Sequence, residues 1–214
     1  MECNFIAGQK TCECEMSIHS PKFVVLTGGP GAGKTAVLEL VRKSFCEHIQ
    51  ILPESASILF SGGFVRGESD ASKKGAQRAI YHVQRELEQI MLDEKKSAVV
   101  LCDRGTLDGL AYWIGNEGSY FDSVKTSFEE ELDRYEAVIH LRSPTVELGF
   151  NHQNPVRVES AEQAALIDEK IGRIWQRHPK YHQITSEKDF LQKAQHSIET
   201  IKAFVPKCCQ SHGN

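Results

Sequence analysis

The feature that most constrains the fold is a glycine-rich octapeptide between an apolar run and an amphipathic segment. Residues 23–26 are continuously apolar, which is typical of a strand buried on both faces. Residues 28–35 then read GGPGAGKT, and apolar residues recur at helical spacing from residue 34 onward. This order of strand, loop and helix predicts an α/β protein with a mainly parallel sheet.

The octapeptide fits the pattern G-x-x-x-x-G-K-[ST] of a phosphate-binding loop. Backbone N–H groups of such a loop surround an anion, and the following helix presents its positive end to the same place. Lys34 is expected to reach the β- and γ-phosphates, and the Thr35 hydroxyl to bind Mg²⁺. The predicted nucleotide-binding residues are Gly28, Gly29, Pro30, Gly31, Ala32, Gly33, Lys34, Thr35 and Ala36.

Strands and helices alternate along the rest of the chain. Further strands are predicted at residues 49–52, 98–102, 137–141 and 181–184, and residues 61–75 are predicted to form a loop. Because helices separate the strands, the sheet is expected to be covered on both faces. We predict one domain over residues 21–205, between a flexible leader (1–20) and a flexible tail (206–214). Its helices are predicted at residues 34–45, 76–95, 107–113, 123–134, 160–177 and 186–203.

Composition excludes several classes of protein. With 25 basic and 29 acidic residues the formal net charge is −4, which argues against a protein dominated by nucleic-acid binding. No apolar run approaches the roughly 18 residues of a membrane-spanning helix. The first twenty residues lack the basic and apolar regions of a secretory signal. These features predict a cytoplasmic protein without an integral membrane segment.

The seven cysteines are predicted to be reduced thiols, because their number is odd and no export signal is present. Cys46 and Cys102 are expected to pack inside the protein. Cys12-x-Cys14 and Cys208-Cys209 could bind a metal or carry a lipid. The favoured interpretation of these terminal pairs is exposed thiols without a function.

A second acid follows the third predicted strand. Asp103 ends an apolar run, and ligands of open parallel sheets bind at that edge. A carboxylate there can hold Mg²⁺, or it can cap the next helix; the phosphate-binding loop favours the metal role. The adjacent Arg104 could clamp phosphate, or form a salt bridge with Asp103 or Asp108.

Residues 28–35 together with the sequence Cys102-Asp103-Arg104-Gly105 carry a family resemblance. The chain resembles the NadR-like P-loop kinases, the AAA-type ATPase/kinase domain shared by NadR and the TRP-translocation-defect proteins. It is more distantly similar to deoxynucleoside and thymidylate kinases. The resemblance covers residues 22–204. It implies a P-loop NTPase, a three-layer sandwich with a five-stranded parallel sheet ordered 2-3-1-4-5, and a lid insertion at residues 143–159.

The resemblance also suggests roles for individual side chains. Glu54, in a Pro-Glu-Ser-Ala segment after the second strand, could accept a proton from an acceptor hydroxyl, or serve as an acid at a helix start. Arg157 in the lid could close over the transferring phosphate, or be a surface charge. In nucleoside kinases the long helix offers side chains to the base. For Gln77, Arg78, Tyr81 and Gln84 of this helix, a solvated face is favoured here.

Together these residues predict an ATP-binding phosphotransferase. Lys34, Asp103, Arg104, Glu54 and Arg157 are the predicted catalytic residues, and Thr35 and Asp103 the Mg²⁺ ligands. The acceptor would be a hydroxyl of a nucleoside-like molecule. ATP is the expected nucleotide, with GTP as the alternative. The alternative functions are a nucleotide-binding regulator of a protein or membrane partner, and plain nucleotide hydrolysis. An enclosed cavity beside the phosphate loop would favour the kinase.

Overall fold

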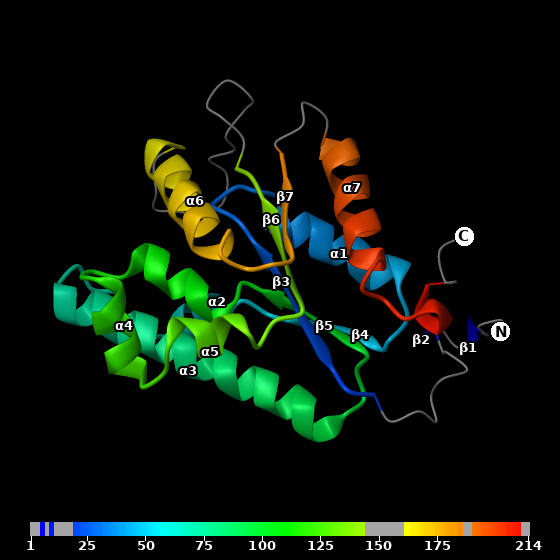
Figure 1. The fold of residues 1–214 in the computed structure, drawn as a ribbon, viewed down its shortest axis with the longest axis horizontal. Helices are drawn as coiled ribbons and strands as arrows, with labels where there is room; N and C mark the ends of the chain where they lie inside the picture. Colours follow the sequence, from blue (N-terminus) through cyan, green and yellow to red (C-terminus); the bar gives the residue numbers. More distant parts are fainter. Residues whose placement is uncertain (1–4, 7–8, 11–18, 144–160, 186–189, 211–214) are drawn as a thin grey trace.

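The computed structural model describes residues 5–6, 9–10, 19–143, 161–185 and 190–210. Its centre is a sheet of five parallel strands in the order β4-β5-β3-β6-β7 (Figure 1). In chain order, and leaving out the two-residue strands at the amino terminus, this order is 2-3-1-4-5, as predicted. The strands are β3 (Lys22–Thr27), β4 (Ile49–Leu52), β5 (Val99–Asp103), β6 (Ala137–Leu141) and β7 (Tyr181–Ile184).

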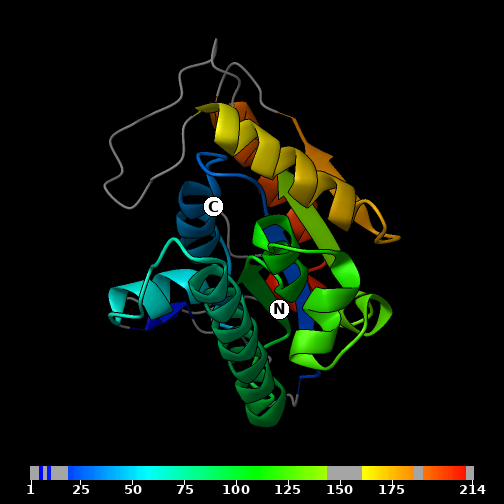
Figure 2. The same ribbon diagram turned by 90° about the vertical axis from the view of Figure 1, so that its left-hand side faces the viewer.

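Alternate residues of the central strand face two separate apolar layers. Val24 and Leu26 pack in one cluster with α1 (Lys34–Ser44) and α7 (Phe190–Lys202). Phe23 and Val25 pack in the other, with α3 (Asp70–Glu94) and α6 (Ala161–Trp175). Figure 2 views the molecule from the side of α3 and α6. The predicted three-layer sandwich is therefore confirmed, and both faces of β3 are buried.

Three helical predictions need correction. A short helix, α2 (Ser55–Ser61), follows β4; it was absent from the predicted helices and was implied only by the alternative role of Glu54 as an acid at a helix start. The helix α3 starts at Asp70, inside the predicted loop, because the Ser69 side chain accepts a hydrogen bond from the Ser72 N–H. The predicted acidic helix 123–134 is interrupted at Lys125, whose φ of 58° is left-handed. Two shorter helices, α4 (Glu117–Val124) and α5 (Phe128–Leu132), take its place. The 3₁₀ helix η1 (Thr106–Tyr112) precedes them in the chain.

The two ends of the chain contain short ordered elements. In the predicted leader, β1 (Phe5–Ile6) pairs with β2 (Gln9–Lys10). In the predicted flexible tail, the 3₁₀ helix η3 (Lys207–Cys209) follows α7. Cys209 is fully buried in the α1–α7 apolar cluster, so the prediction of an exposed thiol was wrong for this residue. Cys46 and Cys102 are buried, as predicted.

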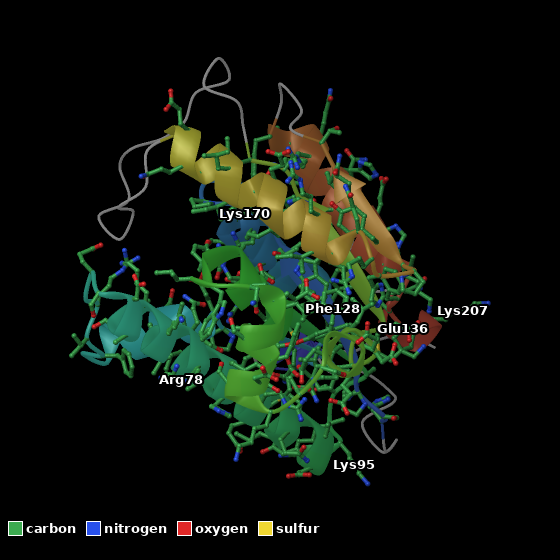
Figure 3. All side chains as sticks on the ribbon, turned by 60° about the vertical axis from the view of Figure 1, so that its left-hand side comes forward. Arg78, Lys95, Phe128, Glu136, Lys170 and Lys207 are labelled. Carbon is green, nitrogen blue, oxygen red and sulfur yellow. The ribbon has the colours of Figure 1, made fainter. Side chains whose placement is uncertain are left out.

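The amino-terminal ends of the sheet strands lie on one side of the molecule, together with the end of α3 and with η3. This side is called the amino edge of the sheet below, and the side with the carboxyl-terminal ends of the strands is called the carboxyl edge. Figure 3 labels three residues of these segments, Lys95 after α3, Glu136 before β6 and Lys207 in η3. The carboxyl-terminal ends lie at the opposite edge, where the phosphate-binding loop follows β3. Across the described part of the chain, the helices fall short of the length and apolar character that crossing a membrane requires.

Candidate active site

Five side chains that were predicted from separate segments line one cavity of about 580 Å³ at the carboxyl edge of the sheet. Three parallel strands end there, and each delivers part of the wall. Lys34 and Thr35 come from the loop after β3, Glu54 follows β4, and Asp103 and Arg104 end β5. More of the wall comes from α2, from the segment after it and from α3, including Phe60, Val65, Ser72, Ala76, Gln77, Ile80, Tyr81 and Gln84.

The phosphate-binding loop needs glycine at two points for different reasons. Gly28 has φ +145°, and a Cβ there would lie 2.2 Å from the Leu141 carbonyl oxygen. Gly33 has φ +91° directly before α1, a conformation that side chains disfavour. The loop therefore folds closely over the end of β6 and turns sharply into α1, which aims the helix amino terminus at the cavity.

Lys34 lies over the loop that precedes it. Its Nζ donates hydrogen bonds to the carbonyl oxygens of Gly28 (3.0 Å) and Gly29 (3.3 Å). Burial, with a smaller contribution from Arg104, lowers the pKa of Lys34 to about 8. A phosphate group beside Lys34 would favour the charged form of its ammonium group, so this side chain is suited to binding phosphate.

The loop is also held from behind by α6, α7 and the end of β6. The Gly29 N–H donates to Asp168 Oδ1 at 2.7 Å. The Lys193 ammonium donates to the carbonyl oxygen of Ala32 at 2.8 Å, and Ser143 Oγ donates to that of Pro30 at 3.1 Å. Asp168 and Lys193 are almost fully buried. These contacts fix the loop's backbone before any ligand arrives, which lowers the ordering cost of binding.

Arg104, which follows β5, binds two carboxylates from other segments. Its Nε donates to Glu54 Oε1 at 2.6 Å and its NH1 to Asp108 Oδ1 at 3.1 Å. Its φ is 76°, an uncommon value for a residue other than glycine, and its N–H donates to the Leu26 carbonyl oxygen. The salt-bridge alternative is thus observed with Asp108, while the guanidinium also lines the cavity.

Glu54 is kept ionised by its neighbours. Burial alone would raise its pKa, but the Arg104 charge and hydrogen bonds from Ser57 and Arg104 more than offset this, so the pKa lies below its usual value. The neighbouring α2 starts at Ser55, which places Glu54 at the helix N-cap without a side-chain capping hydrogen bond. Its carboxylate is therefore directed to Arg104 and to Ser57.

Asp103 has the features of a cation ligand. Its Oδ1 is buried and accepts no hydrogen bond within the described residues. Burial, assisted by Glu54, raises the pKa of this carboxyl, while Lys34 opposes the shift. Thr35 lines the same cavity and supplies a hydroxyl oxygen. Oxygen ligands of this kind are those that Mg²⁺ prefers, so these two residues fit the ion.

Two groups of residues were misjudged or missed from the sequence. Tyr81 and Gln84 are buried and line the cavity with Gln77, so the favoured interpretation of a solvated face was wrong for this side of α3. Asp108 was considered only as a partner of Arg104. It is buried and also accepts hydrogen bonds from the Thr27 hydroxyl, the Gly105 N–H and the Trp175 indole. Nothing local in the sequence signals that convergence.

The predicted lid arginine cannot be placed. Arg157 and residues 144–159 of the lid lie outside the described residues. Arg142, which precedes this segment in the sequence, pairs with Asp168 at 3.1 Å, and Arg173 in α6 pairs with Glu169 at 2.5 Å. Arg177 pairs with Glu117 at 3.0 Å.

Comparison with known proteins decides the family. A family model described as an AAA domain matches residues 23–190. The chain belongs to this family. Solved structures of NadR are similar to it: the NadR protein in complex with NR has a TM-score of 0.66 at 15% identity, covering 87% of this chain and 52% of that one. For NadR in complex with NAD and AMP-PNP the TM-score is 0.62 at 14% identity, covering 86% and 50%.

A nucleotide kinase shares the fold over its whole length. Thymidylate kinase from Ehrlichia chaffeensis has a TM-score of 0.52 at 17% identity, covering 87% of this AAA-domain chain and 100% of that chain. By contrast, the chain spans about half the length of the NadR chains. None of the curated proteins compared with it matches. These results confirm the predicted P-loop kinase fold and the NadR-like family resemblance.

Proposed function

We propose that this AAA-domain protein is a phosphotransferase that moves the γ-phosphoryl group of Mg-ATP to a hydroxyl of a nucleoside-like acceptor. The observation that carries the proposal is the shared cavity. One part of its lining is the phosphate-binding loop with Lys34 and Thr35, and another part, named here the acceptor wall, is α3 with Gln77, Tyr81 and Gln84. Glu54, Asp103 and Arg104 lie along the same cavity. A hydrolase needs only the first part of the lining and a water molecule.

The acceptor wall has the mixture of groups that a nucleoside requires. Phe60, Val65 and Ile80 offer apolar contacts, while Gln77 offers an amide. Gln84 is fixed by a hydrogen bond from Ser55 Oγ to its Oε1 (2.8 Å) and by its own donation to Glu88 (2.8 Å). Apolar contacts combined with polar groups that are fixed in place are typical of small-molecule recognition. The NR named in one similar structure belongs to this chemical class, and thymidylate, named in another, is a nucleoside that already carries one phosphate.

Each residue would act through position and charge. The loop N–H groups and Lys34 hold the triphosphate. Glu54, ionised and oriented by Arg104, accepts the proton of the acceptor hydroxyl as that oxygen bonds to the γ-phosphorus. Arg104 offsets negative charge at the transferring group. The bond from the γ-phosphorus to the β,γ-bridging oxygen breaks, and its electron pair leaves with ADP. Positioning and electrostatics supply most of the rate enhancement.

Asp103 and Thr35 would hold the Mg²⁺ ion. The chemistry that Mg²⁺ supplies when bound is neutralisation of charge on the phosphate oxygens. The buried Oδ1 of Asp103 would gain a partner on binding. Arg157 is proposed as a further phosphate contact from the lid. GTP is the alternative nucleotide, because no residue contact described above selects a base.

The test incubates the protein with a nucleoside library that includes nicotinamide riboside. One reaction contains Mg-ATP and a separate reaction contains Mg-GTP. Products are identified by mass spectrometry. We expect at least one nucleoside to gain a single phosphate, with ATP as the better donor. Nucleotide binding without any phosphorylated nucleoside would contradict the proposal and favour the regulatory or hydrolytic alternatives.

Variants can distinguish the residues that bind the acceptor from those that bind the nucleotide. Gln77→Ala on the acceptor wall should raise the KM of the acceptor and leave the Kd of Mg-ATP unchanged. Lys73→Ala is a matched control, because Lys73 lines the cavity but is an exposed residue paired with Glu68. If Gln77→Ala weakened nucleotide binding and acceptor binding equally, the proposed division of the cavity would be wrong.

A further inference from the structure

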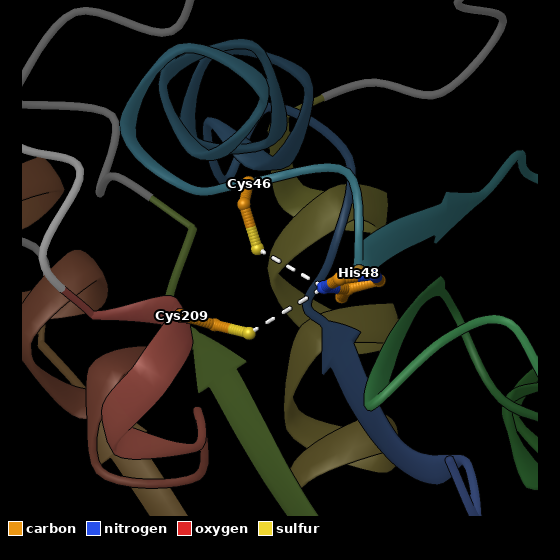
Figure 4. A group of neighbouring side chains, drawn as sticks. All are labelled: Cys46, His48 and Cys209. Carbon is orange, nitrogen blue, oxygen red and sulfur yellow. Dashed lines mark hydrogen bonds between the residues drawn. The ribbon is translucent and has the colours of Figure 1, made fainter. Parts of the chain in front are cut away.

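At the amino edge of the sheet, opposite the cavity, three buried side chains converge on one point. Cys46 and His48 lie in the connection between α1 and β4, and Cys209 lies in η3 near the carboxyl terminus. Their ligand atoms all lie within 4.8 Å of one another (Figure 4). Their exposed fractions are 2%, 6% and 0%. Two distant parts of the sequence therefore meet in a sulfur- and nitrogen-lined site.

The distances match those between ligands of one metal ion. His48 Nδ1 lies 3.7 Å from Cys46 Sγ and 3.8 Å from Cys209 Sγ. With Zn–S bonds of about 2.3 Å and Zn–N bonds of about 2.0 Å, tetrahedral geometry places neighbouring ligand atoms roughly 3.5–3.8 Å apart. Two thiols and one imidazole nitrogen that point at a common centre are soft and borderline ligands, the kind that Zn²⁺ prefers.

The backbone around the three side chains is fixed by hydrogen bonds. The His48 carbonyl oxygen accepts from the Ala98 N–H at 2.8 Å, and the Cys46 carbonyl oxygen accepts from Ile49 at 3.0 Å. The Cys209 N–H donates to the Pro206 carbonyl oxygen at 2.8 Å. A preformed backbone reduces the cost of ordering the ligands when a metal binds.

The candidate for a fourth ligand is His19, in the segment before β3, which is adjacent to the group of three but outside it. The ring of His19 lies 4.8 Å from that of His48, centroid to centroid. Its Nε2 is buried and has no hydrogen-bond partner within the described residues. A buried imidazole nitrogen without a partner costs free energy, and a metal bond would remove that cost.

We propose that Cys46, His48 and Cys209 bind a Zn²⁺ ion, with His19 as the fourth ligand. The two thiols lose their protons on binding, so two thiolates, two neutral imidazoles and Zn²⁺ form a unit without net charge, which suits a buried place. A four-ligand site of this kind is structural, because it leaves no open position for a substrate. It would fasten η3 and the start of β3 to the end of α1, the helix whose other end carries Lys34.

The test uses the full chain, stripped with a chelator and titrated with Zn²⁺ in the presence of reductant and of excess Mg²⁺. The Mg²⁺ is added to saturate the proposed oxygen-ligand site at Asp103. We expect about one bound zinc per chain and a rise in Tm on binding. Co²⁺ in place of Zn²⁺ should give the thiolate-to-cobalt absorption of a tetrahedral site, a signal that needs no variant.

Variants assign the ligands. Cys46→Ser, His48→Ala and Cys209→Ser should each weaken zinc binding by roughly tenfold or more. Cys208→Ser, the neighbouring residue, and Cys102→Ala, a buried thiol in the other apolar cluster, should keep wild-type affinity. Unchanged nucleotide affinity and circular dichroism show that each variant is folded. Unchanged zinc affinity in His19→Ala would overturn the assignment of the fourth ligand.

Three results would overturn the site. The first is an absence of stoichiometric zinc binding and of a thiolate–cobalt signal in reduced wild-type protein. The second is a Cys46–Cys209 disulfide in protein purified without reductant, detected by mass spectrometry, with the reduced form unable to take up zinc. The third is loss of zinc in Cys208→Ser but not in Cys209→Ser.

Discussion

Arg104 connects the chemistry of the cavity to its structure at the scale of single residues. It pairs with Glu54 at 2.6 Å and with Asp108 at 3.1 Å, and it lies near the Lys34 and Asp103 charges. The charge of Arg104 therefore acts to lower the pKa values of Lys34, Glu54 and Asp103. Because Arg104 offsets the effect of burial, Glu54 is ionised at neutral pH. A carboxylate in that state beside the phosphate loop can accept a proton.

Glu54→Gln tests this role. The amide keeps the shape and a hydrogen bond to Arg104 but cannot accept the proton. We expect kcat for phosphoryl transfer to fall by about 100-fold or more, with the Kd of Mg-ATP nearly unchanged. Steady-state kinetics and calorimetry check this. Glu68→Gln, an exposed acid of the same cavity, is the control. Equal losses in both variants would rule out a specific role for Glu54.

Asp168 gives a second prediction at this scale. Burial would raise its pKa, but hydrogen bonds from His140 and Gly29 and the charge of Arg142 lower it below the usual value. A depressed carboxyl pKa stabilises the folded state above the unfolded value of about 3.9, and that contribution is lost as pH falls through the folded pKa. Asp168→Asn should therefore be less stable at pH 7, and the difference from wild type should shrink below about pH 4.

Urea unfolding at a series of pH values measures that difference. Glu169→Gln, at an exposed position on the same helix, should show little effect at any pH. A constant difference between wild type and Asp168→Asn down to the acid limit would show that the carboxyl does not act through its charge.

At the scale of elements, a buried ion pair joins α3 to the turn before β6. Glu88 is fully buried, pairs with Arg134, and accepts hydrogen bonds from Tyr135 OH (2.9 Å) and Gln84 (2.8 Å). The same α3 segment carries Tyr81 and Gln84 into the cavity. The position of the proposed acceptor wall therefore depends on Arg134 compensating the charge of Glu88.

Arg134→Met should destabilise the protein by about 3–5 kcal/mol, because it leaves the Glu88 carboxylate buried without a partner. Adding Glu88→Gln should recover part of the loss, since the amide keeps hydrogen-bonding groups without the charge. Chemical denaturation of the two single variants and the double variant gives the coupling energy. Arg173→Met, which breaks an exposed pair, should cost no more than about 1 kcal/mol. Additive effects at Glu88 and Arg134 would contradict the account.

The elements with strong periodicity could be predicted from the sequence, and those set by local turns could not. Residues 49–52 and 137–141 form strands as predicted, because runs of mainly apolar residues are typical of a buried parallel sheet. Residues 181–184 also form the predicted strand, although two of its four residues are exposed. The break at Lys125 has no glycine or proline to mark it. The early start of α3 depends on the Ser69 cap in a segment rich in glycine, serine and charge, which is typical of a loop.

The site shows the same division. The phosphate loop, Asp103 and Glu54 could be predicted because each follows a strand, and parallel strands bring their ends to one edge. Asp108 and Asp168 could not, since their roles depend on partners as distant in sequence as Trp175 and Gly29. The burial of Tyr81 and Gln84 follows from α3 packing against η1 and α4, which periodicity alone does not specify.

At the scale of the whole molecule, α1 links two edges of the sheet with different chemistry. Its first residue, Lys34, belongs to the cavity at the carboxyl edge. The connection after its last turn carries Cys46 and His48 at the amino edge. Ligands that bind only the folded chain stabilise it, so nucleotide at one edge and zinc at the other should each raise the Tm.

Lys34→Ala should separate the two effects. A Mg-ATP concentration of about 100 times Kd should stabilise wild type by about 2.7 kcal/mol, and this gain should be lost in the variant. The zinc-dependent rise in Tm should remain, because Lys34 lies at the other end of α1. Lys73→Ala should keep both responses. Thermal unfolding with each ligand alone checks this, and loss of the zinc response in Lys34→Ala would indicate a global defect instead.

The most direct test of the central claim follows the γ-phosphoryl group itself. Wild-type protein is given Mg-ATP labelled in the γ-phosphate together with a phosphorylatable nucleoside pool, and the label is traced to its product. The account predicts that label appears on an organic hydroxyl far faster than in inorganic phosphate. It also predicts that Glu54→Gln slows this transfer by about 100-fold or more while retaining nucleotide binding. Label found in inorganic phosphate alone would contradict it.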